Sequence, residues 1–103
     1  MGDNPVVHTR LLKKFLTTAT AQVTGITAAA AANDTTTLAG IAHTLKSAAR
    51  SVGALALGEL CQSLETAGRA GDATACRELT GGLDTAWTVV GAKICDHLGT
   101  KPT

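Results

Sequence analysis

The segment His43-Thr44-Leu45-Lys46-Ser47 combines a nucleophilic side chain, a cation and small or short neighbours. Neutral imidazole is a nucleophile near neutral pH because its reference pKa is about 6.5. Phosphoryl transfer depends on positioning and charge stabilisation more than on covalent machinery. We therefore predict that His43 accepts a phosphoryl group and that Lys46 offsets the negative charge on the transferred oxygens.

The direction of the imidazole follows from the apolar pattern around it. Apolar residues recur at helical spacing between Leu38 and Val52, and this predicts a helix over residues 34–52. On a wheel of about 100° per residue, His43 points roughly 160° away from the centre of that stripe. Lys46 lies about 60° to one side of it. We expect an exposed histidine with a cation beside it.

The same outer face gathers side chains that would let a partner approach the histidine. They are small or positively charged, and they lie close to His43 on the wheel or one turn before it. These candidate partner-binding residues are Ala39, Gly40, Ser47 and Arg50. Small side chains would admit the partner's active site, whereas the arginine would contact an acidic surface and tune the rate of encounter.

Four amphipathic segments must position this face. Three- and four-residue apolar spacings predict helices over residues 5–32, 34–52, 54–67 and 73–98. No alternating strand pattern continues for long. Short loops between four helices predict an all-α, antiparallel four-helix bundle in up-down-up-down order, forming one domain over residues 1–103. A kink or break in the first helix, near residues 17–20 or at Gly25, is compatible with its threonines and glycine.

Composition narrows the classes of function. The 103 residues suffice for one domain with a modest core, and the 45% hydrophobic content is too high for a disordered chain. A net charge of +1 argues against nucleic acid as the main partner, since such domains usually carry a clear basic excess. The chain shows no secretory signal and no apolar run long enough to cross a bilayer. We expect a soluble, cytoplasmic protein that makes no membrane contact.

The cysteines predict packing rather than chemistry. The chain has three cysteines, an odd number, and they show no CxxC spacing. All three, Cys61, Cys76 and Cys95, fall on apolar helix faces. Buried thiols in a reducing compartment explain them. We expect no metal site, because metal ligands would need to cluster more closely.

The chemistry-bearing segment belongs to a longer ordered pattern that covers nearly the whole chain. His43-Thr44-Leu45-Lys46 is followed by Gly53-Ala54-Leu55, Leu60-Cys61, Leu64-Glu65 and Gly68-Arg69-Ala70-Gly71-Asp72. This set resembles the histidine phosphotransfer (HPt) family. One position departs from it, since the family commonly has glycine directly after the lysine and this chain has Ser47. Serine is small, so we expect a receiver domain still to approach.

The resemblance implies a function and a set of partners. Domains of this family are four-helix bundles that relay phosphate between receiver-domain aspartates in two-component phosphorelays. By analogy, His43 would be the phosphoacceptor through its outer ring nitrogen, and Lys46 would stabilise the phosphoryl group. The receiver would supply an acidic pocket and Mg²⁺, so no cofactor of the chain's own is implied. A position at the C-terminal end of a hybrid sensor kinase fits this role better than a stand-alone protein.

Three other interpretations compete with the relay. The dimerisation segment of a histidine kinase usually has an acidic residue after the histidine and a nearby proline, but this chain has Thr44 and no proline nearby. No glycine-rich nucleotide-binding segment is present, so we expect no autonomous kinase activity. The phosphoacceptor domain of a chemotaxis-type kinase, charged by a kinase domain, stays open. So does a noncatalytic helical interaction module with an incidental histidine. The sequence leaves the receiver's identity and the direction of phosphate flow undetermined.

Overall fold

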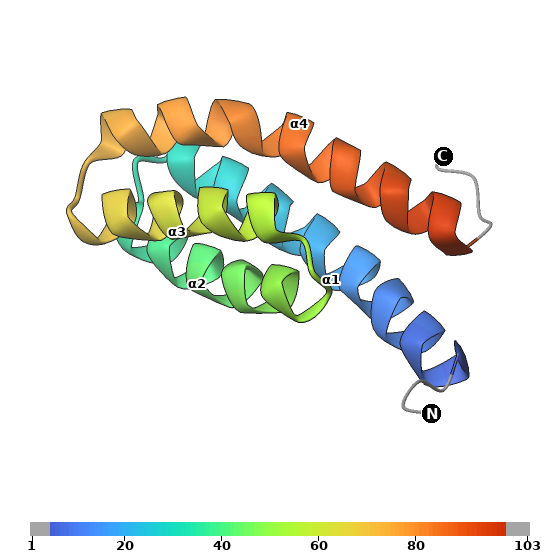
Figure 1. Cartoon of the computed structure of the whole chain (residues 1–103). Helices are drawn as coiled ribbons and strands as arrows, with labels where there is room; N and C mark the ends of the chain where they lie inside the picture. The colour runs from blue at the N-terminus through green and yellow to red at the C-terminus, as the bar shows by residue number, and fades with distance from the viewer. Residues whose placement is uncertain (1–4, 99–103) are drawn as a thin grey trace.

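The structure, a computed structural model, describes residues 5–98, with side chains described over residues 10–94. Its helices are α1 (Pro5–Ala31), α2 (Thr35–Ser51), α3 (Leu55–Arg69) and α4 (Ala73–Leu98), and no strand occurs in that range. Successive helices run in opposite directions and pack side by side (Figure 1). The predicted antiparallel four-helix fold is confirmed. That residues 1–103 form one domain stays a prediction.

The α1 helix runs without a break through residues 17–20 and through Gly25. Four of its threonine hydroxyls donate to the carbonyl oxygens four residues earlier, so these hydroxyls are hydrogen-bonded within the helix. Phe15, Ala19 and Ile26 are buried on one face, and this packing outweighs the weak helix propensity. A Cβ atom on Gly25 would lie 3.0 Å from Cδ1 of Ile41, so the glycine serves close packing and not a break.

Both ends of α2 carry capping features. Oδ1 of Asp34 accepts a 3.1 Å hydrogen bond from the backbone N–H of Thr37. Hydrogen bonding with the side chain of Thr37, and then with this backbone N–H, lowers the pKa of the Asp34 carboxyl. At the other end, Gly53 has φ +79°, a left-handed conformation that costs glycine little. These capping residues fix where α2 begins and ends, so the ends of the helix are set by the local sequence.

The core is built from aliphatic side chains of all four helices. Its largest fully buried members are Ile26, Leu38, Leu45, Leu57, Leu64 and Leu83. Cys61 and Cys76 are buried among them as free thiols, and burial raises the pKa of the Cys61 thiol to about 11. The side chain of Cys95 lies outside the described residues. Within residues 5–98, no helix has both the length and the apolar character that a bilayer crossing requires.

Helices α2 and α3 approach each other very closely at one point. A Cβ atom on Gly68 would lie 2.7 Å from the carbonyl oxygen of Thr35 and 2.8 Å from Cβ of Ala39. Only glycine fits there, because any side chain would push into the backbone of α2. This contact also explains why α3 continues to Arg69, two residues beyond the predicted end: Gly68 packs inside the helix, and Gly71, with φ +72°, lies in the turn.

Candidate functional site

The outward face of α2 presents His43, as the wheel predicts. Leu38, Ala42 and Leu45 are buried on the opposite face at helical spacing, and this fixes the rotation of the helix. The His43 side chain is 55% exposed. An imidazole placed in this way can meet a partner's active site without any movement of the bundle.

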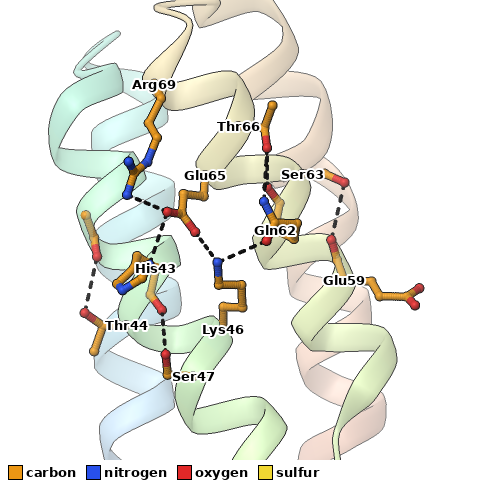
Figure 2. A network of polar contacts seen from close by, with 11 residues as sticks. His43, Thr44, Lys46, Ser47, Glu59, Gln62, Ser63, Glu65, Thr66 and Arg69 are labelled. Carbon is orange, nitrogen blue, oxygen red and sulfur yellow. Dashed lines mark hydrogen bonds and ion pairs between the residues drawn. The ribbon is translucent and has the colours of Figure 1, made fainter.

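A carboxylate on the neighbouring helix holds one side of this imidazole. Nδ1 of His43 lies 3.1 Å from Oε2 of Glu65 on α3. The Glu65 side chain is only 6% exposed, and it is the one charged residue that is buried in the part of the chain described. Figure 2 shows the imidazole side chain turned toward this carboxylate, with the second ring nitrogen on the far side.

Two cations share the Glu65 carboxylate with the histidine. Nζ of Lys46 lies 2.6 Å from Oε1, and Nη2 of Arg69 lies 2.6 Å from Oε2 (Figure 2). The hydrogen bond from Lys46 is the largest of the effects that lower the pKa of Glu65, and the charges of Lys46, Arg69 and His43 add to it. Burial alone would raise that pKa, but the cations outweigh it. Glu65 is therefore ionised at neutral pH.

The ionised carboxylate determines the tautomer of the histidine. A carboxylate can only accept hydrogen bonds, so the 3.1 Å contact requires a proton on Nδ1 of His43. In neutral imidazole the other nitrogen, Nε2, then carries the lone pair. The pair thus directs a nucleophilic nitrogen away from Glu65 and toward the open side of α2.

Lys46 lies deeper than the sequence suggests. Its side chain crosses toward α3 and is 12% exposed, because it binds Gln62 as well as Glu65. The bond from Nζ to Oε1 of Gln62 is 3.0 Å, and Nε2 of Gln62 in turn donates to Oγ1 of Thr66. Lys46 thus belongs to a network between two helices rather than to a free outer face.

Three of the four predicted partner-binding residues are exposed near the histidine. Gly40 has open space where a Cβ atom would stand, Ser47 donates only to the backbone oxygen of His43, and Arg50 is exposed with its stem over Gly58. The prediction that Ala39 lies on the outer face is wrong, because it is buried against Gly68. A wheel centred on one apolar stripe does not show that α3 also covers this flank of α2.

An open hollow lies next to the network. Its volume is about 390 Å³, and it is lined by Thr36, Ala39, Gly40, Gly68 and Arg69. The two glycines and the alanine leave its floor without bulky side chains, whereas Arg69 contributes a cation to its edge. This space on the surface of α2 and α3 is large enough for a phosphoryl group or a partner side chain.

The sequence interpretation assigned no role to Glu65, Arg69 or Gln62, although all three join the network. One signal was available for Glu65. It falls four residues after Cys61 and next to Leu64, so it lies on the inward face of the third helix, where an unpaired carboxylate is costly. A buried acidic residue must find cations or donors, and those come from α2. Among residues 5–98, no group of three or more His, Cys, Asp or Glu side chains is arranged to hold a metal ion.

The comparisons with known proteins agree with this geometry. The family model described as Hpt domain matches residues 10–92, which is most of the chain. The curated proteins yielded no match, and neither did the solved structures. Domains of this family have a histidine phosphotransfer role in two-component phosphorelays, where they interact with receiver domains and kinases. The chain belongs to the histidine phosphotransfer (Hpt) domain family.

Proposed function

We propose that this chain carries a phosphoryl group on Nε2 of His43 and relays it between the aspartates of receiver domains. The observation that supports this most directly is the contact between His43 and the buried Glu65 carboxylate. In the neutral ring, this contact leaves the lone pair on Nε2 of an imidazole that is 55% exposed. A merely solvated surface histidine would have no need of an ionised partner held in place by two cations.

The transfer step balances without a base. The Nε2 lone pair attacks the phosphorus of a receiver's aspartyl phosphate, a P–N bond forms, and the P–O bond to the aspartate breaks. The aspartate leaves as a carboxylate with the bonding electron pair. The ring gains a positive charge and keeps its proton on Nδ1, which is hydrogen-bonded to Glu65. Attack by a second receiver's aspartate on the phosphohistidine reverses the same steps.

Positive charge at the site offsets the charge of the transferred group. Lys46 and Arg69 both lie on Glu65, so together they make the surroundings of His43 electropositive despite the carboxylate. In this proposal Lys46 keeps the stabilising role that the sequence suggests, but it acts through Glu65 and not by a contact with the phosphoryl oxygens. Mg²⁺ and the acidic pocket that polarises the acyl phosphate belong to the receiver.

The surface around the histidine suits a docking partner. Gly40 and Ser47 leave room on either side of the imidazole along α2, and Arg50 brings a positive charge near the receiver's acidic surface. Ala39 contributes only to the floor of the hollow. We place this domain at the C-terminal end of a cytoplasmic hybrid sensor kinase, the setting in which such a carrier receives phosphate from one receiver and passes it to another.

A transfer assay tests the proposal. A prephosphorylated receiver domain with Mg²⁺ is mixed with the wild type or with His43→Gln, after circular dichroism has shown that both are folded. We expect acid-labile, alkali-stable label on the wild type alone. Label on His43→Gln would overturn the assignment of the site.

A second arm separates the competing functions. The same two proteins are incubated with ATP and candidate histidine kinase domains. Label from a kinase domain but from no receiver would replace the relay with the chemotaxis-type phosphoacceptor. No label from either source on folded protein would leave a helical interaction module.

A further inference from the structure

The two cations on Glu65 differ in how freely they could leave it. The Lys46 side chain is 12% exposed, whereas the Arg69 side chain is 68% exposed. Lys46 comes from the middle of α2, and Arg69 is the last residue of α3. The Lys46 ammonium group and the Glu65 carboxylate both lie within the contact between α2 and α3, whereas the Arg69 guanidinium reaches the carboxylate from the solvent side.

Lys46 is held by two acceptors. Nζ donates to Oε1 of Glu65 at 2.6 Å and to Oε1 of Gln62 at 3.0 Å. Moving this ammonium group onto a phosphoryl group would remove from the buried carboxylate the less exposed of its two cationic partners, which is strongly unfavourable. Lys46 is therefore placed to stay on Glu65 throughout the reaction.

Arg69 can move at little cost to Glu65. Its guanidinium shares Oε2 with Nδ1 of His43, so it already lies beside the imidazole. If Arg69 leaves, Glu65 keeps Lys46 on one oxygen and His43 on the other. The guanidinium has five N–H donors, and Glu65 is its only ion-pair partner in the part of the chain described. It also borders the open hollow, which offers room for its movement.

We propose that Arg69 is the residue that binds the phosphoryl oxygens on His43, exchanging Glu65 for the phosphoryl group, and that Lys46 is a positioning residue that acts through Glu65. This proposal rests on the proposed function of His43. A phosphoryl group brings about two negative charges and three acceptor oxygens, and arginine binds such oxygens through paired donors. The new anion thus competes for Arg69 more effectively than one carboxylate oxygen does.

The test uses phosphoramidate as a small phosphodonor, so that no receiver docking enters the measurement. Nε2 attacks its phosphorus and forms the P–N bond of phosphohistidine, while the P–N bond of phosphoramidate breaks and ammonia leaves with the electron pair. On the wild type, we follow the side-chain ¹⁵N resonances of Arg69 and Lys46 while ³¹P resonances report phosphohistidine. We expect the Arg69 guanidinium resonances to move on phosphorylation, and the Lys46 ammonium resonance to keep the position that it has in contact with Glu65.

Variants give a second, kinetic readout. We expect Arg69→Gln to shorten the lifetime of phosphohistidine by tenfold or more, and Arg69→Lys to restore it only in part. Arg77→Gln on α4, which hydrogen-bonds Asn33 instead, removes the same charge and should have no such effect. In a Glu65→Gln background, Arg69→Gln should still shorten the lifetime of phosphohistidine. Lys46→Met should not shorten it further, because the carboxylate through which Lys46 acts has been removed.

The possible results separate this proposal from the one on which it rests. The assignment of Arg69 would be overturned if the Lys46 resonance moved on phosphorylation while the Arg69 resonances did not. It would also be overturned if phosphohistidine lived as long on Arg69→Gln as on the wild type. Either result would leave His43 as the carrier. Absence of phosphohistidine on the folded wild type, with both phosphoramidate and a phosphorylated receiver, would overturn the function of His43 and the role of Arg69 together.

Discussion

Nδ1 of His43 and Oε2 of Glu65 lie 3.1 Å apart although the two residues are 22 positions apart in the chain and belong to different helices. The orientation of the imidazole therefore depends on tertiary packing and not on α2 alone. An isolated α2 peptide would present the same histidine without a fixed tautomer. The carboxylate is the part of the site that the fold contributes.

Replacing Glu65 by glutamine should slow phosphoryl transfer without unfolding the domain. Glutamine can still accept from Nδ1 of His43, but it brings no negative charge to stabilise the ring as it becomes cationic. We expect a loss of about 10- to 100-fold, the range seen when the partner of a metal-bound histidine is removed. Rapid-quench transfer from a phosphorylated receiver measures it. Glu59→Gln removes an exposed carboxylate from the same helix and should transfer at the wild-type rate; equal rates for Glu65→Gln would contradict the role of the pair.

Acid should weaken the fold partly through Glu65. Folding lowers the pKa of Glu65 below its ordinary value of 4.5, so its contribution to stability is present above that pH and is lost as pH falls through the folded pKa. In urea titrations from pH 7 downward, the stability difference between wild type and Glu65→Gln should therefore shrink below about pH 5. Asp34→Asn removes the other carboxyl whose pKa is lowered and shows how much of the acid loss comes from that cap. A difference that stays constant down to pH 3 would contradict the prediction.

The close contact between α2 and α3 should not tolerate even one methyl group. Gly68→Ala places a Cβ atom 2.7 Å from the carbonyl oxygen of Thr35, and we expect a loss of about 1–3 kcal/mol in the free energy of unfolding. Gly81→Ala on α4 is the matched control, because it is exposed and its Cβ atom would meet nothing within 4 Å. That substitution should gain about 0.5–1 kcal/mol. Denaturant unfolding measures the free energy of unfolding of both variants. If the two substitutions changed it equally, α2 and α3 would not be packed as tightly as the structure indicates.

Bulk next to the histidine should obstruct the partner and not the chemistry. Ser47→Trp projects a large ring from the exposed face of α2 beside His43. We expect at least tenfold slower transfer from a phosphorylated receiver and unchanged labelling by phosphoramidate. Ser63→Trp is matched to it, since Ser63 is also exposed and makes the same kind of hydrogen bond to a backbone oxygen four residues earlier. A similar slowing by both substitutions would mean that the receiver does not use this face.

The features predicted well from sequence are those that one helix determines for itself. Apolar spacing within each segment places the four helices, and the rotation of α2 places His43 outside. Cys61 and Cys76 are buried, as their positions on apolar stripes predict. Continuity of α1 was less predictable, because its propensity is poor and its stability comes from packing that the segment alone does not show.

The features that escaped prediction arise between helices. Ala39 is buried because Gly68 lets α3 press onto its flank of α2. Lys46 leaves the outer face because Gln62 and Glu65 lie within its reach. A wheel treats each helix as a lone cylinder with solvent on all polar sides, so it cannot reveal which polar residue faces another helix.

The Gly68–Ala39 contact also acts as a fulcrum. His43 lies four residues along α2 from Ala39, about 6 Å away, and Glu65 lies at a similar distance from Gly68 on α3. A relative tilt of 10° about this point would change the spacing at the His43–Glu65 pair by on the order of 1 Å, but by about 3 Å at the far end of α2 near Ser51. Because the pair lies so close to this point, such a tilt displaces it about three times less than it displaces the distant end of α2.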